Sequence, residues 1–113
     1  MHELSLAESL VQLIEQAATG QGFTRVRKAW LEIGALAGVE PEALRFGFEV
    51  AARASCAEGA ALEILSVPGV AWCYACCRSV TIAAYQDGCP ECGGLRLRVT
   101  GGDRLRLKEL EVE

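Results

Sequence analysis

The sequence has little of several features that mark common classes of protein. Among its 113 residues there is one histidine, aromatic residues account for 6%, and charged residues or glycines interrupt each apolar run. No run approaches the roughly 18 apolar residues of a membrane span. Residues 1–10 carry no basic region ahead of an apolar stretch, which argues against a secretory signal. We therefore expect a cytoplasmic protein without a membrane partner.

An excess of basic residues is also absent. Lysine and arginine number 11 against 15 aspartate and glutamate residues, so the net charge is −4. A protein that follows nucleic-acid phosphates needs a clustered basic face instead. The sequence also has no glycine-rich phosphate-binding loop and no second histidine to complete a catalytic pair. We therefore expect neither an enzyme nor a nucleic-acid partner.

Hydrophobic periodicity predicts two helices. Apolar residues at three- and four-residue spacing predict the first over residues 4–19, and Pro41 suits the first position of the second. Ser5 and Glu8 form a capping-box pair at the start of the first helix. We therefore expect residues 1–3 to form a short arm ahead of it.

The strands and the cysteines complete an α+β fold. Alternating apolar residues predict strands over residues 24–34, 61–67 and 104–112. From residue 70 the chain changes to short strands separated by cysteines and glycines. We expect a small sheet with two helices in residues 1–69, completed by a C-terminal strand in 103–113. Residues 70–102 are expected to form an inserted zinc-ribbon-like lobe.

Four of the six cysteines form two C-x-x-C pairs with twelve residues between them, Cys73 with Cys76 and Cys89 with Cys92. Each pair turns two thiolates toward one ion, and two pairs supply the closed tetrahedral sulfur shell of structural zinc. The same ligands would also hold iron. Redox dithiols are the other alternative, but neither pair stands at the strand-to-helix junction of a thioredoxin-like motif. We predict a structural zinc site.

Two cysteines remain outside these pairs. Cys56 is interpreted as a small hydrophobic residue after the second helix. Cys77 adjoins Cys76 and could replace it as a ligand, or act as a resolving thiol in a sensor of zinc or redox state. The spacing favours Cys76 as the ligand.

The single histidine stands at position two of the sequence. The amine of Met1, the amide and imidazole of His2 and the amide of Glu3 can form fused chelate rings around one ion. A nitrogen-rich, square-planar set of this kind favours Ni(II) or Cu(II). Because the amine and imidazole must lose their protons to bind, we expect affinity to fall on mild acidification.

These features together resemble a known family over nearly the whole chain. The resemblance rests on Met1-His2-Glu3-Leu4-Ser5-Leu6-Ala7, on IGALAGVEPEALRF from Ile33 to Phe46, on the two C-x-x-C pairs with Cys89-Pro90-Glu91-Cys92-Gly93, and on Leu107-Lys108-Glu109-Leu110-Glu111-Val112. The sequence is similar to the HypA/HybF hydrogenase nickel-incorporation proteins. The resemblance implies a nickel metallochaperone that inserts Ni(II) into the large subunit of [NiFe]-hydrogenase and works with the GTPase HypB.

The resemblance also implies roles for individual residues. His2 matches the nickel ligand, with Met1 supplying the amine and Glu3 the adjacent group. The zinc ligands it implies are Cys73, Cys76, Cys89 and Cys92. Glu40 is a further, weaker candidate for nickel, and its other interpretation is a cap or a first-turn charge on the second helix.

One alternative function comes from the residues around the cysteine pairs. A zinc-ribbon module could bind nucleic acid or protein through a basic face with aromatic residues for stacking. The residues of that face would be Arg96, Arg98, Arg104 and Arg106, with Trp72 or Tyr74.

Overall fold

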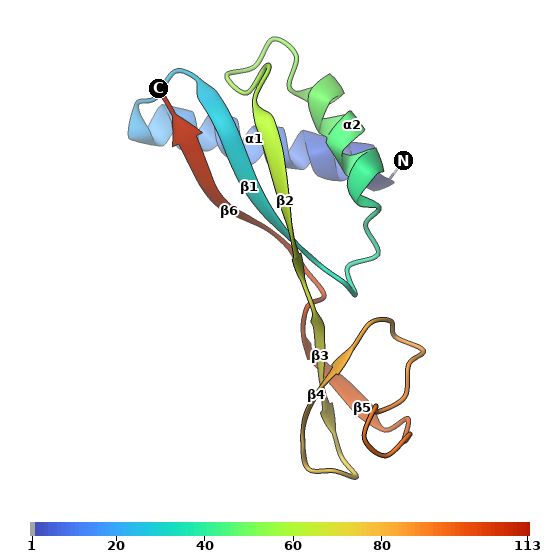
Figure 1. Ribbon diagram of the computed structural model, residues 1–113. Coiled ribbons are helices and arrows are strands. Elements are labelled where there is room, and N and C mark those ends of the chain that lie inside the picture. The colour runs from blue at the N-terminus through green and yellow to red at the C-terminus, as the bar shows by residue number, and fades with distance from the viewer. Residues whose placement is uncertain (1) are drawn as a thin grey trace. The chain divides into compact units, whose positions relative to one another are not determined.

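The structure is a computed structural model that describes residues 2–113, in which two helices and two three-stranded sheets confirm the expected α+β class (Figure 1). The elements in chain order are α1 (His2–Gln21), β1 (Val26–Gly34), α2 (Pro41–Ala51), β2 (Ala61–Val67), β3 (Gly69–Cys73), β4 (Arg78–Ile82), β5 (Leu97–Gly101) and β6 (Leu105–Val112). Neither helix is both long enough and apolar enough to cross a bilayer, over the residues described.

The chain divides into two compact units. Unit 1 comprises Met1–Leu31, Val39–Ile64 and Leu107–Glu113, and unit 2 comprises Glu32–Gly38 and Leu65–Arg106. One sheet has the strand order β2-β1-β6, and the other has the order β4-β3-β5. The division into a nickel-binding and a zinc-binding lobe stays a prediction.

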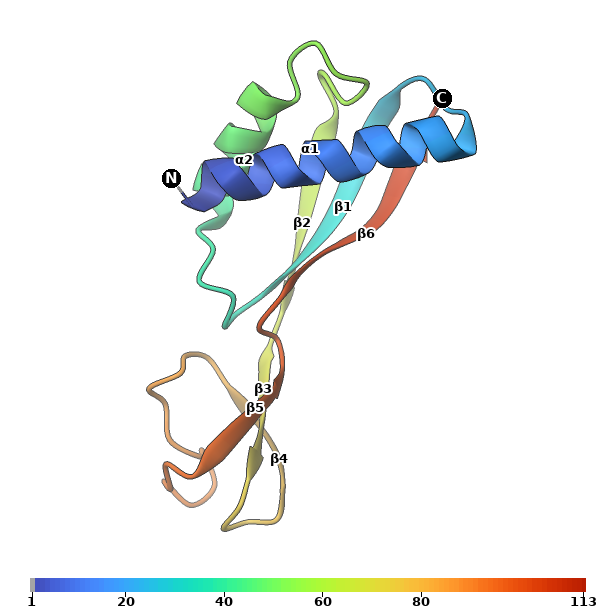
Figure 2. The same cartoon turned by 180° about the vertical axis from the view of Figure 1, so that it is seen from behind.

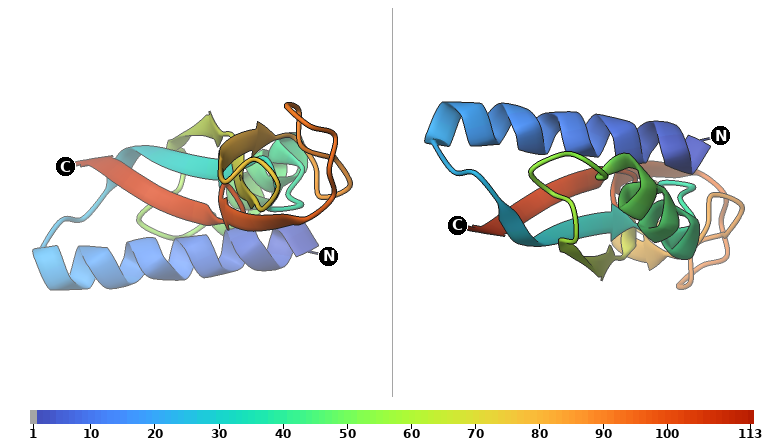
Figure 3. Two further views of the ribbon diagram at one scale, coloured as in Figure 1. Left: turned by 90° about the horizontal axis from the view of Figure 1, so that it is seen from below. Right: turned by 90° about the horizontal axis from the view of Figure 1, so that it is seen from above.

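Helix α1 runs across one face of the sheet β2-β1-β6, as the front, rear and end-on views show (Figures 1, 2 and 3). Its inward positions follow the helical period and are all buried, at Ala7, Leu10, Val11, Ile14 and Ala18. Strand β1 is buried as well, at Ala29 and Leu31. Apolar burial on these two faces forms the core of unit 1.

The start of α1 differs from the expectation. The helix begins at His2, so the predicted arm ahead of it was wrong for His2 and Glu3, and Met1 lies outside the described residues. Ser5 lies inside the helix instead of capping it. The acidic side chain of Glu3 in the first turn favours this longer helix, because it offsets the positive end of the helix dipole.

Helix α2 packs against α1 at a glycine. A Cβ atom on Gly47 would already lie 3.4 Å from the Cβ of Ala7 and 3.5 Å from the carbonyl oxygen of Glu3. A larger side chain would therefore push the two helices apart. The second helix begins at Pro41, as predicted, and Glu40 caps it.

Unit 2 is built on the central strand β3, which pairs antiparallel with both β4 and β5. Its core is small and contains Leu36, Ala71, Cys73, Val80, Ile82 and Cys89. Three glycines allow close backbone crossings beside this core. A Cβ on Gly34 would collide with the carbonyl oxygen of Gly102, and one on Gly69 would lie 2.6 Å from that of Ile82.

Candidate metal centres

The two C-x-x-C pairs form one cluster in unit 2. Cys73 ends β3, Cys76 lies in the turn before β4, and Cys89 and Cys92 lie in the loop before β5. The four Sγ atoms all lie within 4.8 Å of one another. Two of the separations are 3.7 Å, from Cys73 to Cys92, and 3.8 Å, from Cys76 to Cys89.

These sulfur separations are the ones a zinc ion needs. A zinc–sulfur bond of about 2.3 Å gives a regular tetrahedron with sulfur–sulfur edges of about 3.8 Å. Three backbone N–H groups also donate to the sulfur atoms at 3.4 Å, those of Cys76 to Cys73, Glu91 to Cys89 and Gly94 to Cys92. Such donors stabilise thiolates, the form in which cysteine binds metal. The cluster therefore fits a closed four-sulfur metal site.

The turns that follow Cys73 and Cys89 have the same backbone conformation, and Cys77 has the same position in the first turn as Gly93 in the second. The N–H of Cys77 donates to the carbonyl of Cys73, and the N–H of Gly93 donates to that of Cys89, both at 2.8 Å. Both residues have positive φ, 54° at Cys77 and 73° at Gly93. The Cys77 thiol is exposed and lies 3.6 Å from the carbonyl oxygen of Tyr74, outside the cluster. Cys77 thus occupies a position that glycine fills in the other turn.

The thiols of the cluster differ in acidity. The pKa of Cys76 is raised to about 12, first by the hydrogen bond of its thiol with Cys92 and then by burial. Burial also raises the pKa of Cys89, but hydrogen bonds from the backbone N–H groups of Cys92 and Glu91, together with those to the Cys73 and Cys92 thiols, lower it to about 7. Cys89 therefore loses its proton more readily than Cys76, and metal binding requires this loss.

The predicted nickel residues lie at the start of α1 in unit 1. His2 is exposed, and Glu3 is half-buried. Because α1 begins at His2, the first backbone N–H groups have no carbonyl partner within the helix. The N–H of Glu3 instead contacts the carboxylate of its own side chain. The predicted ligand Met1 lies outside the described residues.

The structure also joins Glu3 to Glu40. The N–H of Glu40 donates to Oε2 of Glu3 at 3.2 Å, and this bond is the main reason that the pKa of Glu3 lies below its usual 4.5. Glu40 in turn accepts a hydrogen bond from the N–H of Glu42 at 3.0 Å. The capping role expected for Glu40 is thus confirmed. The Glu3–Glu40 contact itself was not anticipated, because no local pattern links positions so far apart.

Cys56 lies in the loop after α2, in unit 1. Its N–H donates to the Glu15 carboxylate at 2.8 Å, and its carbonyl accepts from the N–H of Val26 at 2.9 Å. Burial, followed by the charge of Glu15, raises the pKa of the Cys56 thiol. A half-buried thiol that resists ionisation fits the expected role of a small packing residue.

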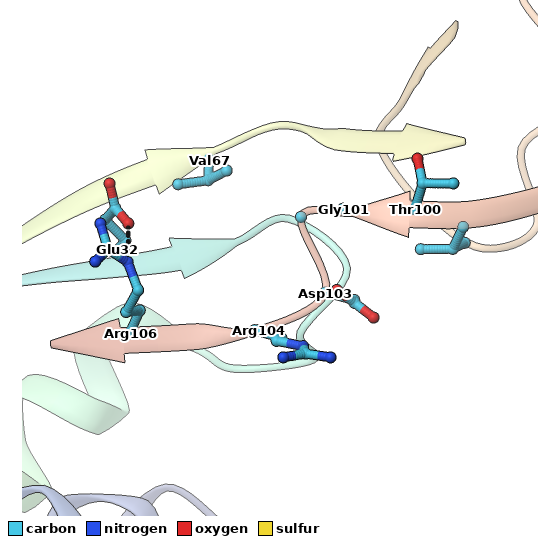
Figure 4. Close-up of a pocket in the computed structure, with 9 residues that line it drawn as sticks. Glu32, Val67, Thr100, Gly101, Asp103, Arg104 and Arg106 are labelled. Carbon is cyan, nitrogen blue, oxygen red and sulfur yellow. Dashed lines mark hydrogen bonds and ion pairs between the residues drawn. The ribbon is translucent and has the colours of Figure 1, made fainter. Parts of the chain in front are cut away.

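The four arginines of the alternative function lie in different surroundings. Arg104 and Arg106 line a pocket of about 350 Å³ in unit 2, where Arg106 forms an ion pair with Glu32 at 2.8 Å (Figure 4). Arg98 instead lies on the solvent side of β5, and Arg96 precedes that strand. The pocket itself contains no thiol or imidazole. It is therefore a poor candidate for a metal site.

The whole chain matches known proteins of one kind. A family model described as "Hydrogenase/urease nickel incorporation, metallochaperone, hypA" matches residues 1–112. Hydrogenase maturation factor HypA of Azotobacter vinelandii is 60% identical over 113 residues, which cover 100% of both chains. Hydrogenase maturation factor HypA of Acidithiobacillus ferrooxidans is 51% identical, with the same coverage.

Two solved structures share the fold. The solution structure of the Ni metallochaperone HypA from Helicobacter pylori has a TM-score of 0.72 at 23% identity, over 97% of this chain and 96% of that one. The solution structure of another HypA protein has a TM-score of 0.73 at 25% identity, over 100% of this chain and 97% of that one.

Proposed function

Because this chain belongs to the HypA family of metallochaperones for hydrogenase nickel incorporation, we propose that it binds Ni(II) through Met1, His2 and Glu3. It would then help to insert the metal into the large subunit of [NiFe]-hydrogenase during maturation. The family match over residues 1–112 carries this proposal, since it includes these N-terminal residues.

The start of α1 supports the proposed nickel ligands. The exposed imidazole of His2 lies in the first turn of α1, whose amide nitrogens have no carbonyl partner within the helix. An amide that has no hydrogen-bond partner in the helix can give up its proton without breaking a helical bond. The resulting negative charge is favoured at the positive end of the helix dipole.

The carboxylates make a different contribution in this proposal. Glu3 already accepts the hydrogen bond from Glu40, and Glu40 accepts one from Glu42. Glu3 would therefore bind nickel through its backbone nitrogen, while its carboxylate holds the first turn of α1 against the start of α2. Glu40 would support the site without being a ligand.

The four-cysteine cluster would hold Zn(II) as a structural ion, with Cys73, Cys76, Cys89 and Cys92 as its ligands. With four sulfur ligands the zinc shell is closed, so the ion would stabilise residues 70–102 and would not exchange with the nickel cargo. The lobe of residues 1–69 and 103–113 would carry the nickel.

The proposed partners follow from family membership. They are the GTPase HypB and the hydrogenase large subunit, and the chain itself would act as a carrier and not as an enzyme. All six cysteines are free thiols, and four of them are grouped as metal ligands. Thiols in this state are typical of a reducing compartment. We place the protein in the cytoplasm on this ground.

Nickel binding to the zinc-loaded protein tests the proposal. We expect His2→Ala to lower the nickel affinity by more than the roughly 10–100-fold that loss of an outer-shell partner costs. Extension of the chain ahead of Met1 should lower it as well, because the free amine is lost. Glu3→Gln keeps the backbone nitrogen and should retain most of the affinity.

The matched control is Gln12→Ala, which alters an exposed residue of the same helix. Calorimetry measures the affinity, and metal analysis checks that each variant keeps one zinc. Unchanged nickel affinity in both His2→Ala and the extended protein would overturn the proposed ligand set.

A further inference from the structure

The sheet of unit 2, with strands β4, β3 and β5 (Figure 1), has alternating buried and exposed residues, and so one core face and one solvent face. Residues 71 and 73 of β3 point into the core, so Trp72 and Tyr74 are on the other side. Pairing register places Trp72 opposite Arg98 of β5 and opposite Ser79 of β4. The Arg96 guanidinium lies 5.7 Å from the centre of the Tyr74 ring. We call these four residues, Trp72, Tyr74, Arg96 and Arg98, the aromatic–arginine face.

The outer parts of these four side chains are exposed to solvent. Trp72 is 36% exposed and Tyr74 is 47% exposed, and both arginines are exposed too. Among the ion pairs of residues 2–113, none includes Arg96 or Arg98. Tryptophan, tyrosine and arginine are the residues that most often provide binding energy at protein interfaces. Grouped on one rigid sheet, they form a surface suited to a partner.

The contact with the Tyr74 ring orients the guanidinium of Arg96. Stacking on the ring limits the motion of the guanidinium while leaving its N–H groups exposed. A guanidinium arranged in this way loses less entropy when it forms paired hydrogen bonds to a carboxylate. Trp72 supplies an apolar surface beside the arginines, because it lies opposite Arg98 on the neighbouring strand. The chemistry complementary to this face is an apolar side chain next to carboxylates.

Nucleic acid fits this face less well. A single strand needs a continuous basic groove over several nucleotides. Here Ser79, Thr81 and Thr100 extend the solvent face with neutral groups. The nearby Arg78 is already paired with Glu91 at 2.8 Å. Two unpaired guanidinium groups on a protein of net charge −4 give only a short positive patch.

We propose that the aromatic–arginine face of unit 2 is a docking site for a partner protein segment that presents carboxylates next to an apolar side chain. None of its four residues is a predicted metal ligand, and all four belong to unit 2. The inference does not depend on nickel binding by this chain. It adds a recognition role to a unit whose cysteines explain only its stability.

Nuclear magnetic resonance of the zinc-loaded full chain provides the test. The probe is a short synthetic peptide in which glutamates flank a central leucine, and the matched peptide has glutamines in their place. We expect the glutamate peptide to shift the indole resonance of Trp72. Trp30 serves as an internal control, because it is half-buried in unit 1 beside Lys28.

Charge variants connect the shift to the proposed residues. The double variant Arg96→Gln/Arg98→Gln should weaken peptide binding by about tenfold or more, which corresponds to about 1.4 kcal/mol. Arg53→Gln changes the same charge at an exposed residue of unit 1 and should leave binding unchanged. One zinc per chain in each variant shows that unit 2 remains folded.

Three results would overturn the proposal. Equal binding of the glutamine peptide would show that charge has no part in recognition. Preferential binding of oligothymidylate at Trp72 would assign the face to nucleic acid. A concentration-dependent rise in molecular mass that the double arginine variant abolishes would show that the face joins two copies of this chain.

Discussion

Replacement of Cys73 by serine removes one of the four clustered sulfur atoms, and we predict that it unfolds unit 2. Cys73 is fully buried at the end of the central strand β3, and its sulfur lies 3.7 Å from that of Cys92. The matched control is Cys77→Ser, the same change four residues later. The Cys77 thiol is exposed and lies outside the cluster, so its loss should leave the unit intact.

The size of the effect follows from the core of unit 2. Apart from cysteine and alanine, its buried side chains are Leu36, Val80 and Ile82. At about 1.5–3 kcal/mol each, these three contribute roughly 5–9 kcal/mol of apolar burial. A structural zinc ion contributes roughly 10–16 kcal/mol in comparable small sites. A zinc ion at the cluster would therefore stabilise unit 2 more than its apolar core does, and the core alone should not keep the unit folded when a ligand is lost.

Zinc content and amide resonances together measure this outcome. The Cys73→Ser protein should contain much less than one zinc per chain and should lose the dispersed resonances of β3, β4 and β5. The α1 resonances should persist, because that helix has its own core in unit 1. A Cys73→Ser protein that kept stoichiometric zinc and dispersed β3 resonances would refute the reasoning. Loss of zinc from Cys77→Ser would also contradict it.

Two further predictions concern the backbone crossing and the start of α1. Gly34→Ala should lower the free energy of unfolding by about 1–3 kcal/mol in urea melts, because its Cβ collides with the Gly102 carbonyl. In contrast, Gly20→Ala, in open space on α1, should raise it by about 0.5–1 kcal/mol. If both glycine variants behaved alike, the crossing would not be tight. Glu3 has a lowered pKa, so the hydrogen bond of its charged form to Glu40 stabilises the fold above pH 4.5 and is lost as pH falls through the lowered value. Paired urea melts should show wild type more stable than Glu3→Gln at neutral pH, and the difference should vanish in acid; a constant difference would contradict this assignment.

The cysteine cluster was predictable from the sequence because its geometry is mostly local. Each C-x-x-C turn sets the separation of its own two thiols, and the twelve-residue connection is long enough to bring the pairs together. Spacing favoured Cys76 over its neighbour Cys77 as the ligand, but it did not give the conformation of Cys77. Comparison with Gly93 in the second turn held the missing signal, since both residues have positive φ.

The start of α1 shows the limit of local rules. Ser5 and Glu8 form a valid capping pair in the sequence, yet the helix begins at His2. The capping pattern could not account for the packing of α1 on α2 at Gly47. Nor could it foresee that the Glu40 N–H would donate to Glu3. Contacts between residues 37 positions apart decided this end of the helix.

By itself, the sequence determined the α+β class, the cap of α2 and the four cysteines that cluster, because periodicity, capping and ligand spacing depend on near neighbours in the chain. It also placed a single histidine at position two. Only the tertiary structure decided that the carboxylate of Glu3 accepts a hydrogen bond from Glu40, and that Trp72 faces solvent with Arg98. These facts depend on strand register and helix packing, which join residues far apart in the chain and are fixed only when the whole fold forms.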